Sequence, residues 1–408
     1  MTDTLLAVDD STANKCIADD IQSSEETSHN SKRFEGLFDS TINSSNLLDQ
    51  QIHSNTSVCT ISSISSVLCL LGITTMMLVE MTKVLTRLKV QFRSRGISAR
   101  ETGVPEIPDH IKNFVFICDD GSVLPLTTPA RFLPDIRQME IRPSDVFVVS
   151  WPKSGTTWMQ YIVSQIALGR DFADQNNLWK THIFLEAPRH PNKLDESEGM
   201  YKIAEKLPSP RFLKSHLKLN LLPVRLLDSQ AKIIYVARNP KDTAVSYFNY
   251  CRMNSLLPPY KDWTEFFEYF LKGLLPYGDW FEHLLPWWEM RNEPNILFMK
   301  YEDMIKYPER TVRHVSKFLN KTLSEETLQD ISKRSSFDVM KKSPTANPDL
   351  MNIPIFYERD PVLFMRKGVI GDWKNYFTIT QNERFDELYR RKMEGSYLDF
   401  DFGNLSRL

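Results

Sequence analysis

The stretch VFVVSWPKSGTTWMQYIVSQIAL, residues 146–168, decides the fold because it joins a strand, a tight loop and a helix. Its first residues form a short β-branched, apolar run that predicts a buried strand. The loop contains Pro152 and Gly155, and an apolar-periodic helix begins near Thr156. In such an arrangement backbone N–H groups and a helix N-terminus face an anion.

Side chains of the same loop favour an anion further. Lys153 adds a positive charge, and Ser154, Thr156 and Thr157 add hydroxyl donors. The order Lys-Ser-Gly differs from the Gly-Lys-Ser/Thr of a Walker P-loop, and no leading glycine stands upstream. The loop alone therefore favours phosphate binding only modestly over an ordinary strand–turn–helix connection with an exposed lysine.

Similar apolar runs recur along the chain and alternate with longer helical patterns. They predict strands at 145–150, 211–215, 232–237 and 295–300, and helices at 156–168, 241–254, 263–274, 307–319 and 381–393. Alternating strands and helices are typical of a parallel sheet. We therefore expect an α/β fold, a single large domain with a mainly parallel central sheet flanked by helices on both faces.

Composition limits the class of protein. The chain has 408 residues, 41% of them hydrophobic and 25% charged, which is enough for a sizeable core. Fifty basic and 52 acidic residues leave a net charge of −2, which argues against a nucleic-acid-binding protein. The five cysteines, at 16, 59, 69, 118 and 251, lack any C-x-x-C spacing. We therefore expect a reducing compartment, with neither a disulfide framework nor a zinc site.

The first hundred residues differ from the rest. Residues 1–57 carry ten acidic and three basic side chains, so we expect a disordered acidic tail. A hydrophobic segment, 58–80, follows; its uncharged part, 58–79, is long enough to span a bilayer as a helix. A helix or loose tail lying on the globular domain is the alternative, and the sequence favours neither the membrane span nor this surface segment.

A basic linker, 81–104, separates this segment from the globular domain at 105–408. The linker contains six Lys and Arg residues, which would hold its side in the cytoplasm if the hydrophobic segment inserted into a membrane. Both readings of the hydrophobic segment leave the globular domain in the cytosol. We therefore predict a cytoplasmic catalytic domain, with membrane association through 58–79 left open.

A second segment, KIIYVARNPKDTAVSYF, places a cation beside the sheet. Arg238 follows the predicted strand and stands at its carboxyl edge, where ligands collect in open parallel sheets. Asn239 and Pro240 suit a helix start, which puts Ser246 on the first turns of that helix. A strand-end Asp that would hold magnesium is absent here. Phosphate charge would thus be met by arginine and backbone rather than by a metal.

Two more segments complete the candidate site. In FMRKGVIGDWKNYF, two adjacent cations precede a glycine at 366–368, and such a loop can close its backbone onto a phosphate. In RFLKSH, residues 211–216, a strand points Lys214 and His216 to one face. A lone histidine is more often structural, but one beside a lysine at a strand end favours a general base with a charge partner.

Together the four segments, in this order and spacing, resemble the cytosolic sulfotransferase family from about Pro105 to Leu408. Members of that family transfer a sulfuryl group from 3′-phosphoadenosine-5′-phosphosulfate (PAPS) to hydroxyl or amine acceptors. The resemblance implies PAPS as donor, no metal, and a P-loop-like loop that binds the phosphosulfate. Trp151 departs from the tyrosine usual in the family, and the partly matching segment 184–191 leaves the acceptor open.

The resemblance also implies roles for individual residues. His216 would be the catalytic base and Lys214 its neighbouring cation, while Lys153 would contact the bridging oxygen; Ser246 completes the expected catalytic set. Phe184 and Tyr250 are weaker candidates for an acceptor pocket. The expected nucleotide-binding residues are Lys153, Ser154, Gly155, Thr156, Thr157, Trp158, Arg238, Ser246, Tyr301, Ser335, Ser336, Phe337, Arg366, Lys367 and Gly368.

Three functions follow from these observations. The first is a PAPS-dependent sulfotransferase acting on a small apolar acceptor, such as a phenol or hydroxylated lipid, as a homodimer through the family-like motif at 374–383. The second is a magnesium-dependent phosphotransferase, which needs the Gly-Lys-Ser/Thr order and the strand-end Asp that the sequence lacks. The third is a catalytically silent nucleotide-binding or interaction protein on the same fold. Retention of Lys153 and His216 favours the first.

Overall fold

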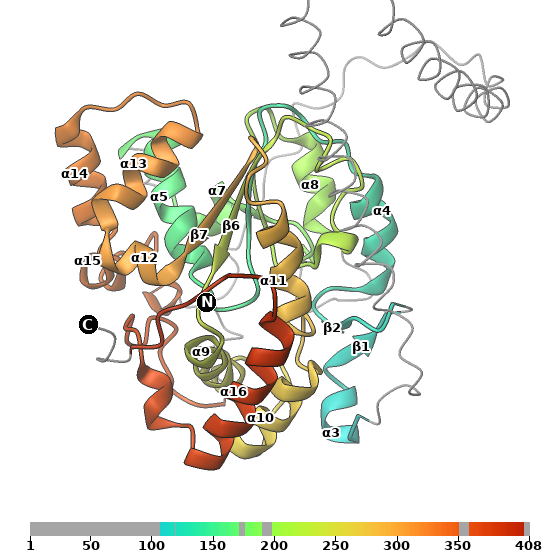
Figure 1. The fold of residues 1–408 in the computed structure, drawn as a ribbon. Coiled ribbons are helices and arrows are strands. Elements are labelled where there is room, and N and C mark those ends of the chain that lie inside the picture. The colour runs from blue at the N-terminus through green and yellow to red at the C-terminus, as the bar shows by residue number, and fades with distance from the viewer. Residues whose placement is uncertain (1–106, 119, 171–175, 190–197, 351–358, 404–408) are drawn as a thin grey trace, which may run out of the picture. The chain divides into compact units, whose positions relative to one another are not determined.

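The computed structural model describes most of the expected globular domain (Figure 1). The acidic tail, the hydrophobic segment and the basic linker predicted within residues 1–104 lie outside the described residues. Where the structure does describe the chain, no helix is long and apolar enough to cross a bilayer. The described residues are 107–403, apart from 119, 171–175, 190–197 and 351–358.

A five-stranded parallel sheet forms the centre of the domain. Across the sheet the order is β4 (Ile183–Phe184), β5 (Phe212–Ser215), β3 (Val146–Val149), β6 (Lys232–Ala237) and β7 (Ile296–Lys300), and every neighbouring pair is parallel. A separate antiparallel pair joins β1 (Val115–Ile117) and β2 (Val123–Pro125). The predicted α/β class and parallel sheet are confirmed. The unpredicted β4 has only two residues, too few for an apolar run to reveal.

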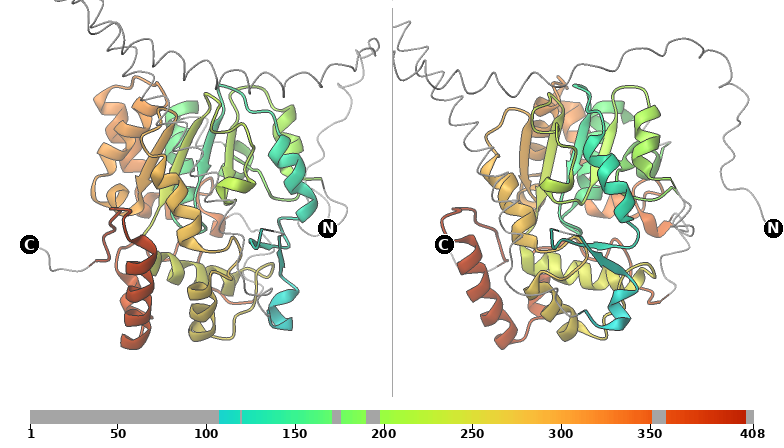
Figure 2. Two further views of the ribbon diagram at one scale, coloured as in Figure 1. Left: turned by 45° about the vertical axis from the view of Figure 1, so that its right-hand side comes forward. Right: turned by 90° about the vertical axis from the view of Figure 1, so that its right-hand side faces the viewer.

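Side chains of the central strands alternate between two apolar cores. On β3, Val146 and Val148 pack into the smaller core, whereas Phe147 and Val149 pack into the larger one. A strand buried on both faces reads as a continuous apolar run, which is why periodicity alone located it. Helices therefore cover both faces, as predicted (Figures 1 and 2).

The two cores assign the helices to the two faces of the sheet. The smaller core receives α5 (Thr156–Leu168), α12 (Tyr301–Lys306), α13 (Pro308–Phe318) and α14 (Glu325–Arg334). The larger core receives α4 (Leu133–Gln138), α8 (Met200–Lys206), α9 (Pro240–Met253), α10 (Trp263–Lys272), α11 (Trp280–Glu289) and α16 (Ile379–Met393). Shorter helices are α3 (Asp109–Lys112), α7 (Leu178–Thr181) and α15 (Phe337–Lys341).

Capping explains where the site helices begin. The Asn239 side chain accepts a hydrogen bond from the backbone N–H of Asp242, and Pro240 occupies the first turn of α9. At α16, Thr378 and Gln381 form a reciprocal capping box. The helix predicted at 307–319 instead starts at Pro308, directly after α12, because proline suits the first turn of a helix.

Candidate active site

Four parallel strands end at one rim, and each delivers predicted site residues. The loop with Lys153 follows β3, His216 follows β5, Arg238 follows β6, and Tyr301 follows β7. These residues line one cavity of about 510 Å³. All the other predicted site residues line it too, except Ser154, which is buried. The structure thus brings together side chains that the sequence scatters over more than two hundred residues.

The loop after β3 has a shape that only a glycine permits. Gly155 has φ 106°, and a Cβ added there would lie 2.7 Å from the Tyr301 ring. Lys153 also has a positive φ of 66°, which is uncommon for a residue with a side chain. No side chain caps the start of α5, so its first N–H groups face the cavity as donors for an anion.

Buried polar atoms around this loop fit an anionic ligand. Ser154 Oγ, Trp158 Nε1 and Arg238 Nε have no hydrogen-bond partner among the described residues. Buried donors are nearly always hydrogen-bonded in proteins. Trp158 and Arg238 line the cavity, so a bound ligand rich in acceptor oxygens would satisfy their donors.

Arg238 connects the loop after β3, which contains Lys153, with the loop that begins at Arg366. Its guanidinium donates to the carbonyl of Lys153 at 3.4 Å and to the carbonyl of Val369 at 3.2 Å. It also lies 4.3 Å from the centre of the Tyr301 ring. The predicted cations thus meet at one place and are not spread over unrelated surfaces.

The Asp372 carboxylate forms ion pairs with both cations of the loop at 366–368. Arg366 and Lys367 each lie 2.5 Å from Asp372. Burial alone would raise the pKa of Asp372, but hydrogen bonds from Lys367, Asn375 and Arg366 lower it below its ordinary value. Gly368 packs so closely that a Cβ there would lie 2.3 Å from a Phe337 ring atom. This packing explains why a glycine follows the two cations.

The Lys153 ammonium is held between two rings. Its Nζ lies 3.5 Å from the centre of the Phe364 ring and 4.4 Å from that of Tyr250. Burial, and next the like charges of Lys214 and Arg238, lower the pKa of Lys153 to about 7. An anion bound beside Lys153 would restore its charge.

His216 is arranged as a neutral base. Its Nδ1 lies 2.8 Å from the carbonyl oxygen of Ser150. Because a carbonyl can only accept, Nδ1 carries the hydrogen and Nε2 is the nitrogen that can take up a proton. Burial, and next the charge of Lys214, hold the pKa of His216 well below its ordinary value. The imidazole is therefore uncharged at neutral pH.

Lys214 lies between aromatic rings beside that imidazole. Its Nζ is 4.0 Å from the centre of the Phe184 ring and 5.6 Å from that of Trp179. Burial lowers the pKa of Lys214 to about 8, against the opposing effect of the Glu186 carboxylate. Lys214 and His216 thus line the same cavity, as the two-residue spacing predicts.

Sequence reasoning missed several residues of this site. Tyr277, in the loop between α10 and α11, has its ring centre 5.5 Å from that of His216. Trp179 and Phe364 flank Lys214 and Lys153, and Glu186 is buried behind them. No local pattern marks these positions, because isolated aromatic residues are most often core. Within the described residues, no group of three or more His, Cys, Asp or Glu side chains could hold a metal ion.

A parallel α/β fold with cationic loops at the strand ends and a neutral imidazole beside them defines an anion-binding enzyme. Residues 143–397 match the sulfotransferase domain family. Human sulfotransferase 1C2 is 42% identical over 65% of this chain and 88% of its own length. For mouse sulfotransferase 1B1 the identity is 38%, over the same shares of the two proteins.

Solved structures agree with these relatives. Retinol dehydratase in complex with retinol and PAP superposes with a TM-score of 0.64 at 28% identity, over 72% of this chain and 97% of that one. A mouse sulfotransferase complexed with PAP superposes with a TM-score of 0.58 at 35% identity, over 69% of this chain and 95% of that one. The chain belongs to the sulfotransferase family. The resemblance found in the sequence and the enzyme class that it implied are confirmed.

The electrostatic coupling at the site makes one prediction. Replacing Lys214 by Met removes a positive charge that lowers the pKa of Lys153, so that pKa should rise from about 7 by about one unit. NMR titration of ¹³C-methylated lysines measures it directly. Lys218→Met is the matched control, since Lys218 pairs with Glu282 instead. An unchanged Lys153 titration in Lys214→Met would contradict the coupling.

Proposed function

We propose that the protein transfers a sulfuryl group from PAPS to a hydroxyl or amine group of a small apolar molecule. The observation that carries this proposal is the convergence of Lys153, His216 and Arg238 on one cavity. Arg238 donates hydrogen bonds to the carbonyl groups of Lys153 and Val369, and so joins the loop after β3 to the loop that begins at Arg366. The candidate anion-binding groups and the candidate base line the same cavity. The PAP complexes of two structural relatives support the same donor.

The donor site fits a nucleotide with two anionic ends. The loop after β3, with Lys153 to Trp158, would bind the 5′-phosphosulfate. Arg238, Ser246 and the loop at 366–368 would bind the 3′-phosphate, and Tyr301 with Ser335 to Phe337 would line the rest of the pocket. Buried donors and two tightly packed glycines fit such an acceptor-rich ligand. No metal is required in this proposal, because arginine, lysine and backbone N–H groups neutralise the phosphate charge.

The chemistry follows from the state of each residue. When bound, PAPS supplies the sulfuryl group. His216, neutral at neutral pH, accepts the acceptor's proton at Nε2. Lys153 stabilises the charge that develops on the departing phosphate oxygen, and the exclusion of water strengthens that interaction. Lys214 lies beside the imidazole and keeps its pKa low.

Aromatic rings indicate the class of acceptor. Trp179, Phe184 and Tyr277 line the cavity near Lys214 and His216, and Tyr250 lines it beside Lys153. Apolar, aromatic walls with few polar groups suit a flat apolar molecule that carries one hydroxyl. Retinol and androsterone in complexes of the structural relative retinol dehydratase are molecules of this kind. A phenol or a hydroxylated lipid is therefore our proposed acceptor.

The donor assignment predicts a clear preference in binding. Calorimetric titration should show tight binding of 3′,5′-adenosine bisphosphate (PAP), the desulfated nucleotide, without added metal. ATP with magnesium should bind far more weakly, because the site lacks a strand-end carboxylate for the metal. Tighter binding of ATP with magnesium would overturn the proposal in favour of a phosphotransferase.

The catalytic assignment predicts the phenotype of His216→Ala. Removal of a general base typically costs about 10²–10⁴-fold in rate, so we expect sulfation of a phenol to fall by that factor. PAP affinity should be nearly unchanged, because the nucleotide is held by other residues. Loss of PAP binding would show that the role of His216 is misassigned. A wild-type protein that binds PAP but sulfates no phenol or hydroxylated lipid would favour the catalytically silent alternative.

The assembly and location of the protein complete the proposal. We propose a homodimer through residues 374–383, in a cytoplasmic protein whose residues 58–79 are available for membrane association.

Ile379, in the proposed dimer segment 374–383, is 81% exposed at the start of α16. Ile379→Glu should convert a dimer into a monomer by light scattering. Tyr397→Glu, at a side chain 94% exposed outside the segment, should leave the dimer intact. A dimer in Ile379→Glu would exclude this interface.

A further inference from the structure

Glu186 is a fully buried carboxyl group that lies just beyond Leu185, the residue after β4. Its Oε1 accepts the backbone N–H of His216 at 2.6 Å, and its Oε2 accepts the hydroxyl of Ser215 at 2.8 Å. The Ser215 hydroxyl oxygen in turn accepts the backbone N–H of Leu217 at 3.0 Å. One carboxyl group thus fixes three consecutive residues around the candidate base. Hydrogen bonds to charged groups are stronger than neutral ones.

The opposite side of His216 is held as well. His283 Nε2 lies 3.0 Å from the carbonyl oxygen of His216, and His283 Nδ1 lies 2.8 Å from the Tyr235 hydroxyl. Because a carbonyl accepts, Nε2 of His283 is the donor and its Nδ1 accepts from Tyr235. Together with the bond to Ser150, the N–H, the carbonyl and the ring of His216 are all fixed. The remaining ring nitrogen, Nε2, is left for the chemistry.

Glu186 also acts on charge. Burial lowers the pKa of Lys214 to about 8 although the Glu186 carboxylate raises it. Burial also raises the pKa of Glu186 to about 7, so Glu186 is ionised at the alkaline pH where Lys214 loses its proton. Lys214 in turn lowers the pKa of His216. Lys214 also lowers the pKa of Lys153 in the β3 loop and of His182 at the end of α7, and Glu186 raises the pKa of Tyr277 in the α10–α11 loop. Of these described groups, Glu186 alone is a carboxylate that supports the charge of Lys214.

We propose that Glu186 is a positioning residue for catalysis, which fixes the main chain of His216 and keeps Lys214 protonated beside it. The inference rests on the sulfuryl transfer proposed above. Glu186 is absent from the wall of the cavity, so it acts through His216 and Lys214 and does not contact the reactants. A purely structural carboxyl would stabilise the fold without changing how the reaction depends on pH.

Two substitutions separate the two roles. Glu186→Gln keeps the shape and an acceptor for the His216 N–H but removes the charge. At saturating PAPS the bound anion keeps Lys153 charged, so Lys214 sets the alkaline limb of the kcat profile. Lys214 should lose its proton at lower pH in this variant, and that limb should move down by about one pH unit. Glu186→Asp keeps the charge but shortens the reach. Its kcat should fall by up to about 10²-fold from misplacement of His216, while the alkaline limb stays near that of the wild type.

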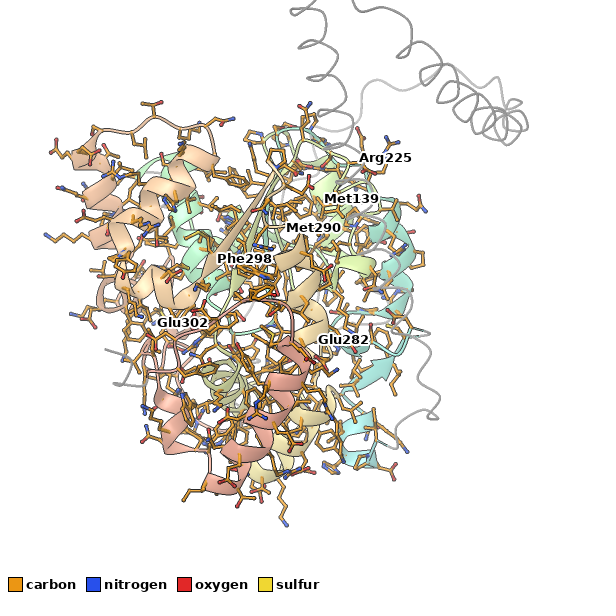
Figure 3. All side chains as sticks on the ribbon, in the orientation of Figure 1. Met139, Arg225, Glu282, Met290, Phe298 and Glu302 are labelled. Atoms are coloured by element: carbon orange, nitrogen blue, oxygen red, sulfur yellow. The ribbon has the colours of Figure 1, made fainter. Side chains whose placement is uncertain are left out.

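Glu302 provides the matched control. It is equally buried at the start of α12, beyond the carboxyl end of β7 (Figure 3), and its Oε1 accepts the backbone N–H of Asn239 at 2.8 Å. It therefore fixes the chain next to Arg238, at the nucleotide end of the site. Glu302→Gln should weaken PAP binding and leave the alkaline limb of kcat in place. Thermal unfolding and PAP titration of every variant report on the fold and the donor site.

The outcomes are distinct. An alkaline limb in Glu186→Gln that coincides with the wild type overturns the proposal. The proposal is also overturned if the double variant Glu186→Gln, Lys214→Arg shows the same lowered alkaline limb as Glu186→Gln. Arginine does not lose its proton in this pH range, so the limb should return to its wild-type position. NMR titration of methylated Lys214, with a lowered pKa expected in Glu186→Gln, tests the charge effect without turnover. A wild type that lacks transfer activity would defeat the proposed function, whereas an unmoved Lys214 pKa would defeat this inference.

Discussion

Three cations line one cavity, and the rest of the site depends on the burial of their charges. Lys153, Lys214 and Arg238 lie where water is largely excluded, so their charges are costly until an anion arrives. The pKa of Lys153 falls to about 7 for this reason. The site is therefore suited to an anionic ligand, and binding of the proposed donor would restore the charge of Lys153.

The same charges set the state of the base. An imidazole that is buried beside a lysine remains neutral at neutral pH, which is the form that can accept a proton. The main chain of His216 is bound at its N–H by Glu186 and at its carbonyl by His283. A residue with these fixed contacts has little freedom to change its orientation, which suits the role proposed for His216. Rigidity and electrostatics thus act together at this residue.

Sequence patterns located β3, β5, β6 and β7 of the central sheet, the helices α5, α9, α10, α13 and α16, and most of the residues named here as the candidate site. The apolar run at 146–149, the glycine at 155 and the periodicity of 156–168 are local features, and the structure keeps the predicted bounds of α5 unchanged. The helix α11 was missed, because its aromatic residues and Pro286 disturb the helical pattern. The strand β4 was missed because parallel pairing with β5, and not its own composition, makes it a strand.

The sequence by itself determined the parallel α/β class and the family, together with the cations of the strand-end loops, because each lies in a short segment with its own chemistry. Only the tertiary structure decided what holds the base. Glu186 and His283 lie 30 and 67 residues from His216 along the chain, and their hydrogen bonds go to its main chain. Main-chain contacts between distant segments leave no pattern in the residue types. Such contacts exist only once the parallel strands have brought their carboxyl ends to one rim.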